Sequence, residues 1–334
     1  MSLAETAASV SGAFDSIPII DIGHASTPEE RAALARQIRD ACMNVGFFYI
    51  SNHGIPQETI GKVCSAMEAY FSLPLETKMK LYHRDKNFRG YEPVFSSNAD
   101  PANRADLHEG FIFGWEELVP KENDEKRTND GAMAGANVWP SEPSGFREAC
   151  LNYYHAAVGV GRVLFHLFAL ALDLPATYFD DKTKNSAASM RLIHYPPQTG
   201  PEGDGIVGIG AHSDFRCFTI LWQEPDIQAL ELLNSEKQWV KAPPIPGTLV
   251  INIGDQLARW TNDVFRSTVH RAINRSGVRR YSIPLFFGTD YHVQIEPMPS
   301  CVSPERPPKY EPVAAGDYVH QRLQEVYYQD TATS

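Results

Sequence analysis

The second half of this chain contains a series of short segments rich in β-branched, aromatic and aliphatic residues, divided by Gly, Pro, Asn and Asp. Such segments, spaced at intervals of roughly 8–12 residues, predict an antiparallel sandwich or barrel such as a double-sheet jelly roll. We therefore expect a mainly β core. Between residues 190 and 287 the segments are MRLIHY, GIGAHS, CFTILW, LELLN, LVINIG, HRAIN and RRYSIPLFF.

The first half has the pattern of supporting helices. After a β-rich run at Ile17–Ile22, the sequence Ser26–Glu30 combines a hydroxyl cap with early acidic residues, which predicts the start of a helix. Apolar residues continue at helical spacing to about Asn44, and Gly46 ends the helix. Further helices are predicted over residues 56–71, 75–82, 144–172 and 316–328, with a strand over residues 47–50.

Charge and cysteine content narrow the possible partners. The chain has 30 Lys+Arg against 41 Asp+Glu, a net charge of −11, and a surface of that sign repels phosphate backbones and anionic lipids. We expect a small-molecule partner, with no nucleic acid, no membrane and no obligate protein partner. The 5 Cys lack CxxC spacing, which indicates reduced thiols. No leader is recognisable at the start, so we expect a cytoplasmic protein.

A His-x-Asp triplet lies in the β-rich segment around residue 212. Successive side chains of a strand alternate between its faces, so His212 and Asp214 project from one face and can reach one ion. The same spacing occurs at His83 and Asp85, but that pair lies in a charged stretch typical of a solvated helix end. His270 offers a third ligand from a distant strand.

Two histidines and a carboxylate on one face of a metal form the facial triad of non-haem Fe(II) oxygenases, which leaves coordination positions open. A zinc hydrolase is the competing interpretation, and a handle for a cosubstrate separates the two. Arg280 and Ser282 stand two residues apart in a predicted strand. A guanidinium binds a carboxylate through two parallel hydrogen bonds, so the distal carboxylate of 2-oxoglutarate fits this pair.

These motifs occur in a fixed order along the chain. They are His212-x-Asp214, Gly254-Asp255, Ser267-Thr-Val-His270-Arg and Arg280-Tyr-Ser282, preceded by Ile17-Pro-Ile-Ile-Asp, Gly46–Ile55 and Arg89-Gly-Tyr91. The set resembles the isopenicillin N synthase-like family of Fe(II)/2-oxoglutarate dioxygenases, over roughly Ile17 to Phe287.

The resemblance implies a distorted double-stranded β-helix, a cupin-like jelly roll, that uses Fe(II), 2-oxoglutarate and dioxygen to hydroxylate, desaturate or cyclise a small metabolite, plausibly in specialised metabolism. By position, the iron ligands are His212, Asp214 and His270, and the 2-oxoglutarate site comprises Arg280, Ser282 and Tyr195. The Asn that the family usually has two positions before this tyrosine is Ile193 here.

The same interpretation divides the chain into four parts that share one core. Residues 17–140 form a helix and strand support, residues 144–174 a long spine helix, residues 185–290 the catalytic double-stranded β-helix, and residues 291–334 a C-terminal extension with a helix.

The substrate pocket is less tightly specified. Arg191 has the same strand parity as Tyr195. It either faces the cavity, where it binds the substrate or the C1 carboxylate of 2-oxoglutarate, or forms a surface salt bridge. Phe215 and Phe286 either line the pocket or belong to the core. Three neighbouring motifs are predicted to be structural. Asp106–Glu109 forms a loop near the entrance, His194 has a structural role, and Gly254–Asp255 forms a turn.

Two other functions remain open from the sequence. A family oxidase would keep the iron site but take all electrons from its substrate, without 2-oxoglutarate. A non-catalytic jelly-roll binding protein would need no complete set of metal ligands.

Overall fold

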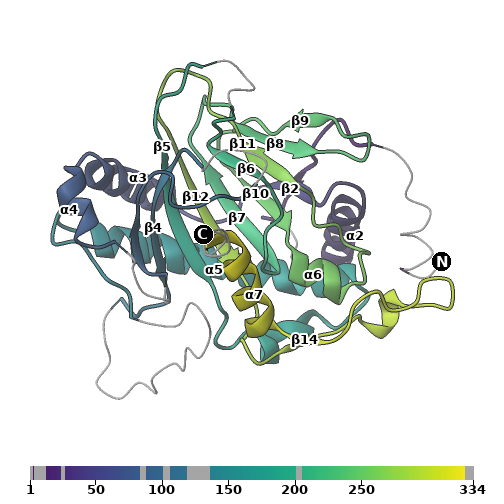
Figure 1. Ribbon diagram of the computed structural model, residues 1–334. Helices are drawn as coiled ribbons and strands as arrows, with labels where there is room; N and C mark the ends of the chain where they lie inside the picture. The colour runs from purple at the N-terminus through teal and green to yellow at the C-terminus, as the bar shows by residue number, and fades with distance from the viewer. Residues whose placement is uncertain are drawn as a thin grey trace.

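The computed structural model describes Leu3 and residues 13–23, 27–82, 88–100, 106–118, 136–200 and 205–327. Two sheets form the centre of the molecule, and helices cover one side of the larger sheet (Figure 1). The described residues are thus organised as a jelly-roll core with helical support, as the strand pattern predicts. His83 and Asp85 lie outside the described residues.

The large sheet has eight strands, all antiparallel to their neighbours except the first pair, β1 and β2. In spatial order they are β1 (Ile19–Asp21), β2 (Phe47–Ser51), β10 (Thr248–Ile253), β7 (Phe218–Gln223), β12 (Arg280–Phe287), β5 (Ser189–Tyr195), β4 (Glu109–Gly114) and β3 (Gly90–Glu92).

The small sheet brings distant parts of the second half together. Its strands are β6 (Ile209–His212), β11 (His270–Ala272), β8 (Leu230–Leu233) and β9 (Trp239–Lys241), in that order. In the pairing of β6 with β11, His212 lies directly opposite His270. A separate pair, β13 (Gln294–Ile295) and β14 (Val313–Ala314), leads into the C-terminal helix.

The helices from the first half of the chain support the large sheet from one side, whereas the C-terminal helix lies on the other side (Figure 1). Thr27 and Glu30 form a reciprocal capping box at the start of α2 (Pro28–Asn44). The others are α3 (Gln57–Phe71), α4 (Leu75–Met79), α5 (Phe146–Ala171), α6 (Asp255–Trp260) and α7 (Ala315–Tyr327), with 3-10 turns η1 (Ala176–Lys182) and η2 (Pro299–Cys301).

The long helix α5 is the spine behind the sheet. A Cβ on its Gly161 would lie 2.3 Å from the ring of Phe287, so the glycine lets helix and sheet approach closely. The rings of Phe168 on α5 and of Phe218 and Phe287 on the sheet belong to one buried cluster. By length and hydropathy α5 could cross a membrane, but 61% of its most apolar stretch is buried within this core.

Two predictions differ from the structure by more than two residues or in the type of element. The helix predicted over residues 75–82 ends at Met79, because the backbone carbonyl of Leu81 accepts the amide of Tyr91 and Tyr82 pairs with the same residue. The turn predicted at Gly254–Asp255 instead begins α6. A Cβ on Gly254 would lie 2.1 Å from the carbonyl oxygen of Arg216, so glycine is needed where this helix starts against the sheet.

Candidate active site

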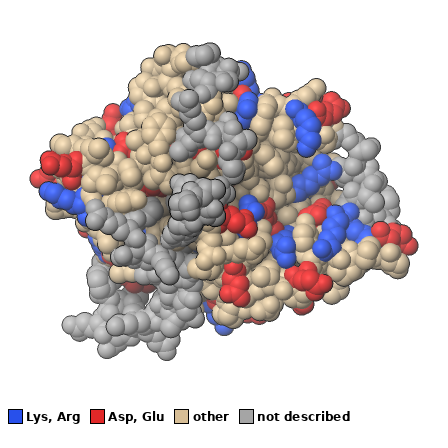
Figure 2. Space-filling model, viewed as in Figure 1, with Lys and Arg blue, Asp and Glu red and all other residues tan. Residues whose placement is uncertain are grey.

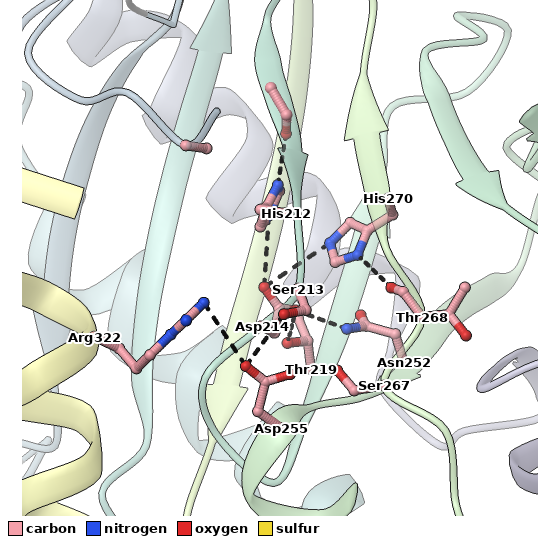
Figure 3. Close-up of polar contacts among 12 residues, drawn as sticks. His212, Ser213, Asp214, Thr219, Asn252, Asp255, Ser267, Thr268, His270 and Arg322 are labelled. Carbon is pink, nitrogen blue, oxygen red and sulfur yellow. Dashed lines mark hydrogen bonds and ion pairs between the residues drawn. The ribbon is translucent and has the colours of Figure 1, made fainter. Parts of the chain in front are cut away.

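Three side chains that can bind a metal converge at one end of the core, where β6 and β11 meet (Figure 3). One ligand atom from each of His212, Asp214 and His270 lies within 4.8 Å of the others. The Nε2 atoms of the two histidines are 3.7 and 3.9 Å from Oδ1 of Asp214. One ion placed between these atoms can contact all three.

Backbone carbonyls set the orientation of both imidazoles. Nδ1 of His212 donates to the carbonyl of Gly210 at 2.8 Å, and Nδ1 of His270 donates to that of Thr268 at 3.1 Å. In neutral histidine a protonated Nδ1 leaves a lone pair on Nε2. Both lone pairs therefore point toward Asp214, as metal coordination requires.

Asp214 is buried and ionised. Burial opposes its charge, but His270, His212 and the hydrogen bonds from Thr219 and Asn252 together outweigh burial and lower the pKa of the carboxyl. These bonds go to Oδ2, at 2.7 Å from Asn252, while Oδ1 faces the histidines. The carboxylate thus offers one oxygen to the protein and one to a metal.

Arg280 forms a second polar centre on the same cavity. Its side chain is 1% exposed, and its guanidinium lies 4.9 Å from the ring centroid of Tyr195. Nη2 donates to Gln223 at 3.1 Å, whereas Nε and Nη1 have no hydrogen-bond partner among the described residues. Ser282 donates to the Tyr195 hydroxyl at 3.4 Å. A buried, incompletely paired guanidinium is costly and fits an anionic ligand.

One cavity of about 200 Å³ joins these two centres. Its wall includes both histidines, Asp214, Arg280, Ser282 and Tyr195. The three predicted substrate-pocket residues also line it: Arg191, Phe215 and Phe286. The structure therefore brings all nine predicted site residues to one cavity.

Arg191 is fixed by an ion pair inside the cavity wall rather than at the surface. Its Nη2 pairs with the fully buried carboxylate of Glu92 and lies 2.5 Å from Nε2 of His108. Burial, and then the charge of Arg191, lower the pKa of His108 to about 4. Residues Asp106–Glu109, expected as a plain entrance loop, thus contribute directly: Asp106 lines the cavity and His108 orients Arg191.

The outer wall of the cavity is apolar and includes the C-terminal helix. Val319 and Leu323 of α7 pack with Ile112 of β4 and with Phe215, and all four line the cavity. Arg322 of α7 lies 4.9 Å from the ring centroid of Phe215. The helix predicted at the end of the chain is thus a wall of the pocket.

His194 points to the other side of β5 and has a structural environment. Its Nδ1 lies 2.7 Å from Oε1 of Glu109, whose Oε2 accepts from Lys78 at 2.7 Å and from Tyr91 at 2.5 Å. Both carboxylate oxygens are therefore bonded to protein groups.

Comparison with known proteins identifies the family to which this arrangement belongs. The model of the 2OG-Fe(II) oxygenase superfamily matches residues 186–289, and the N-terminal model described as "non-haem dioxygenase in morphine synthesis" matches residues 17–142. A 2-oxoglutarate-Fe(II) type oxidoreductase of Emericella nidulans is 36% identical over 93% of this chain and 90% of its own length. The chain belongs to the 2-oxoglutarate- and Fe(II)-dependent oxygenases.

Relatives of this dioxygenase act on or bind different small molecules. A homoarginine-6-hydroxylase of Oryza sativa is 33% identical over 93% of this chain and 97% of its own length. A Neurospora crassa structure in complex with alpha-KG (2-oxoglutarate) and thymine is 28% identical and covers 92% of this chain and 96% of its own, with a TM-score of 0.82. The dioxygenase uses Fe(II) and 2-oxoglutarate, and the donors described above fit both.

Several residues of the site are not found by sequence reasoning. Thr219 and Asn252 hold Asp214, Gln223 holds Arg280, and Glu92 with His108 holds Arg191. Their only sequence signal is strand parity: Thr219 and Gln223 stand four apart in β7 and so face the same side.

Proposed function

We propose that His212, Asp214 and His270 bind the iron and that Arg280 binds the C5 carboxylate of 2-oxoglutarate. The carrying observation is that the incompletely paired, buried guanidinium of Arg280 and the converging metal donors line one cavity. The planar guanidinium supplies the two parallel donors that a carboxylate needs, and the hydroxyls of Ser282 and Tyr195 lie beside it.

In this function the side chains orient reactants and exclude water. Thr219 and Asn252 keep one oxygen of Asp214 turned to the iron, and the carbonyls of Gly210 and Thr268 keep both imidazoles in the coordinating tautomer. When bound, iron and 2-oxoglutarate supply the oxidation: one atom of dioxygen enters succinate as CO2 is released, and the other hydroxylates a C–H bond of the substrate.

We further propose that the substrate is a small molecule with an apolar or aromatic body and a carbonyl-type acceptor. Phe215, Phe286 and Leu323 give the cavity apolar walls. Arg191 supplies N–H donors, and because Glu92 balances its charge, a neutral acceptor suits it better than a carboxylate. The Neurospora structure with thymine supports a nucleobase-like compound as the first to try.

The test of the iron and 2-oxoglutarate roles is oxygen uptake with succinate release, driven by Fe(II) and 2-oxoglutarate. We expect both to require His212, Asp214 and His270. Omission of 2-oxoglutarate should stop turnover; oxidation of a substrate without it would support the oxidase alternative and overturn this assignment.

Substrate class is tested by a screen of matched neutral and acidic compounds, such as thymine against an aromatic carboxylate of similar size. We expect neutral carbonyl compounds to stimulate succinate formation and Arg191→Leu to abolish the stimulation. Stimulation by the carboxylate alone would contradict the class proposed for Arg191.

We also propose a cytoplasmic enzyme with no nucleic-acid, membrane or obligate protein partner. The net charge of −11 and five unpaired cysteines support this. On the face shown in Figure 2, acidic and basic side chains are interspersed over the region of α6 and β9. Imaging of a fluorescent fusion and the mass of the purified protein in solution test the location and the absence of a partner.

A further inference from the structure

Asp255 lies directly beside the metal-binding residues without contributing a metal donor. It is the first residue of α6, and its backbone amide donates to the carbonyl of Asp214 at 2.7 Å. The preceding Gly254 donates to the carbonyl of Cys217 at 2.9 Å. The start of α6 is thereby fixed to the segment that carries two of the three donors.

The carboxylate of Asp255 joins three parts of the chain (Figure 3). Oδ2 accepts from Ser213, which stands between His212 and Asp214, at 3.1 Å. Oδ1 accepts from Ser267, three residues before His270, at 2.7 Å. Both metal-binding segments are therefore tied to the two oxygens of one side chain.

The third connection goes to α7. The hydroxyl of Tyr318 donates to Oδ2 of Asp255 at 3.2 Å, and Nη2 of Arg322 lies 3.9 Å from the same oxygen. Residues four apart lie on one face of a helix, so one face of α7 contacts Asp255. The neighbouring positions Val319 and Leu323 meet the cavity wall.

Contacts outside this carboxylate hold the beginning of α7 and its apolar face, where Val319 and Leu323 pack with Ile112 and Phe215. The pairing of β13 with β14 fixes the entry to the helix, and Gln256 donates to the carbonyl of Ala315 at 2.8 Å. Farther along, Asp255 provides the polar attachment, through Tyr318 and Arg322. The helix that forms the cavity wall and the two metal-binding segments thus contact the same carboxylate.

We propose that Asp255 is a positioning residue that couples the docking of α7, and hence closure of the substrate pocket, to alignment of the metal-binding side chains. This rests on the proposed iron site. By thermodynamic reciprocity, metal binding strengthens the docking of α7 and docked α7 raises the affinity for metal.

The test measures Mn(II) affinity by calorimetry, with the redox-inert ion in place of iron, and amide hydrogen exchange in α7 with and without Mn(II). Removal of groups that orient metal ligands typically costs 10- to 100-fold in affinity, and we expect about tenfold for Asp255→Asn. Tyr318→Phe changes a residue that is not next to the metal donors. It should lower the affinity for Mn(II) by about threefold, which corresponds to a modest coupling energy.

Amide hydrogen exchange should report the effect of metal binding on the docking of α7. In the wild type, Mn(II) should slow exchange of the α7 amides; in Asp255→Asn this protection should be lost. Ser267→Ala removes only the connection between Asp255 and the His270 segment. It should therefore lower the affinity for Mn(II) and reduce the protection of the α7 amides by Mn(II). Amide exchange of α7 without metal should stay unchanged. Should Asp255→Asn fail to fold, Tyr318→Phe and Ser267→Ala carry the test.

Matched controls come from a parallel contact in the same region. Tyr310 donates to Asp263 at 2.8 Å, so Tyr310→Phe and Asp263→Asn remove the same groups without touching the metal-binding segments. Both should bind Mn(II) like the wild type. Wild-type affinity in Tyr318→Phe and Asp255→Asn, with α7 exchange independent of Mn(II), would overturn the coupling. Failure of the wild type to bind Mn(II) would instead refute the iron site.

Discussion

Two buried clusters in this protein combine histidine with a carboxylate, and each is built on a cross-strand pair. His212 lies opposite His270 on β6 and β11, and Glu109 lies opposite His194 on β4 and β5. In the second cluster every carboxylate oxygen is bonded, to His194, Lys78 and Tyr91. In the first, both Nε2 atoms and one oxygen of Asp214 converge on the cavity. Residue type alone does not mark a metal site; unused donors that converge do.

The physical consequence is a division between binding and stability. A cluster whose hydrogen bonds are all satisfied within the protein contributes to the folded state, and losing one member leaves a buried charge unpaired. A cluster with converging unused donors costs stability in the absence of its ligand and recovers free energy when the ligand binds. Substitutions should therefore separate the two clusters.

The largest effect is expected for His270→Ala. Loss of a metal donor should remove the several kcal/mol that a metal supplies to the transition state, about 10³-fold or more in turnover. The free energy of unfolding without metal should fall less than for a substitution in the fully bonded cluster, because only the bond to Thr268 and the packing on Phe47 are lost. Succinate assays and urea unfolding in the presence of chelator measure both.

The counterpart in the other cluster is His194→Ala. It should lower stability and leave Mn(II) affinity unchanged. Equal loss of metal binding in both variants would erase the distinction between the clusters.

Lys78→Met tests whether the Glu109 cluster, in which both carboxylate oxygens are bonded, stabilises the fold. Lys78 pairs with Glu109 at 2.7 Å with both side chains buried, and breaking a buried pair costs about 3–5 kcal/mol. Urea unfolding should show this loss without a change in Mn(II) affinity. Lys62→Met is the matched control: its pair with Glu58, at 2.6 Å, is exposed, and exposed pairs contribute little to stability because water screens them. Similar losses in the two variants would contradict a structural role for the buried pair.

Sequence reasoning finds the residues whose relation is local. Alternation along one strand relates Arg280 to Ser282 and Arg191 to Tyr195, and the structure places each pair on the cavity. It misses what depends on the approach of distant segments. Glu92 reaches Arg191 through the pairing of β3, β4 and β5, and no local pattern encodes that register.

The same limit applies at the C-terminal end of the chain. A polar helix is predicted over residues 316–328, but it becomes a wall of the cavity only because Val319 and Leu323 pack with Ile112 and Phe215. The turn expected at Gly254–Asp255 is a helix start for a similar reason: close packing against Arg216 decides it. Elements follow from the sequence, whereas their contacts require the fold.

Arg280→Gln extends the comparison to a buried cation with unused donors. The guanidinium is incompletely paired among the described residues. We therefore expect its loss to lower the affinity for 2-oxoglutarate and to leave the stability of the fold unchanged. A charged hydrogen bond contributes about 1.5–3 kcal/mol, so the dissociation constant of 2-oxoglutarate should rise about 10- to 100-fold. Calorimetry with Mn(II) present measures this. Unchanged affinity would show that the cosubstrate carboxylate binds elsewhere.

The smallest effect is expected at His108. Like His194 it is bonded only to protein groups, but its partner Arg191 lines the cavity. Its Nδ1 donates to the carbonyl of Gly208 at 2.7 Å, so Nε2 accepts from Arg191. A proton on Nε2 would face that guanidinium. Burial and the charge of Arg191 accordingly lower the pKa of His108 from its ordinary 6.5 to about 4.

The direction of the pH dependence follows from this shift. Between pH 6.5 and 4 the unfolded chain binds a proton at His108 that the folded chain excludes, so the free energy of unfolding rises with pH across this window. Between pH 6.5 and pH 5, the shifted pKa of His108 should lower the free energy of unfolding by at most about 2 kcal/mol. His108→Gln, whose amide oxygen can still accept from Arg191, should show a shallower pH dependence in urea unfolding. Identical slopes for the two proteins would mean that His108 titrates normally in the folded protein.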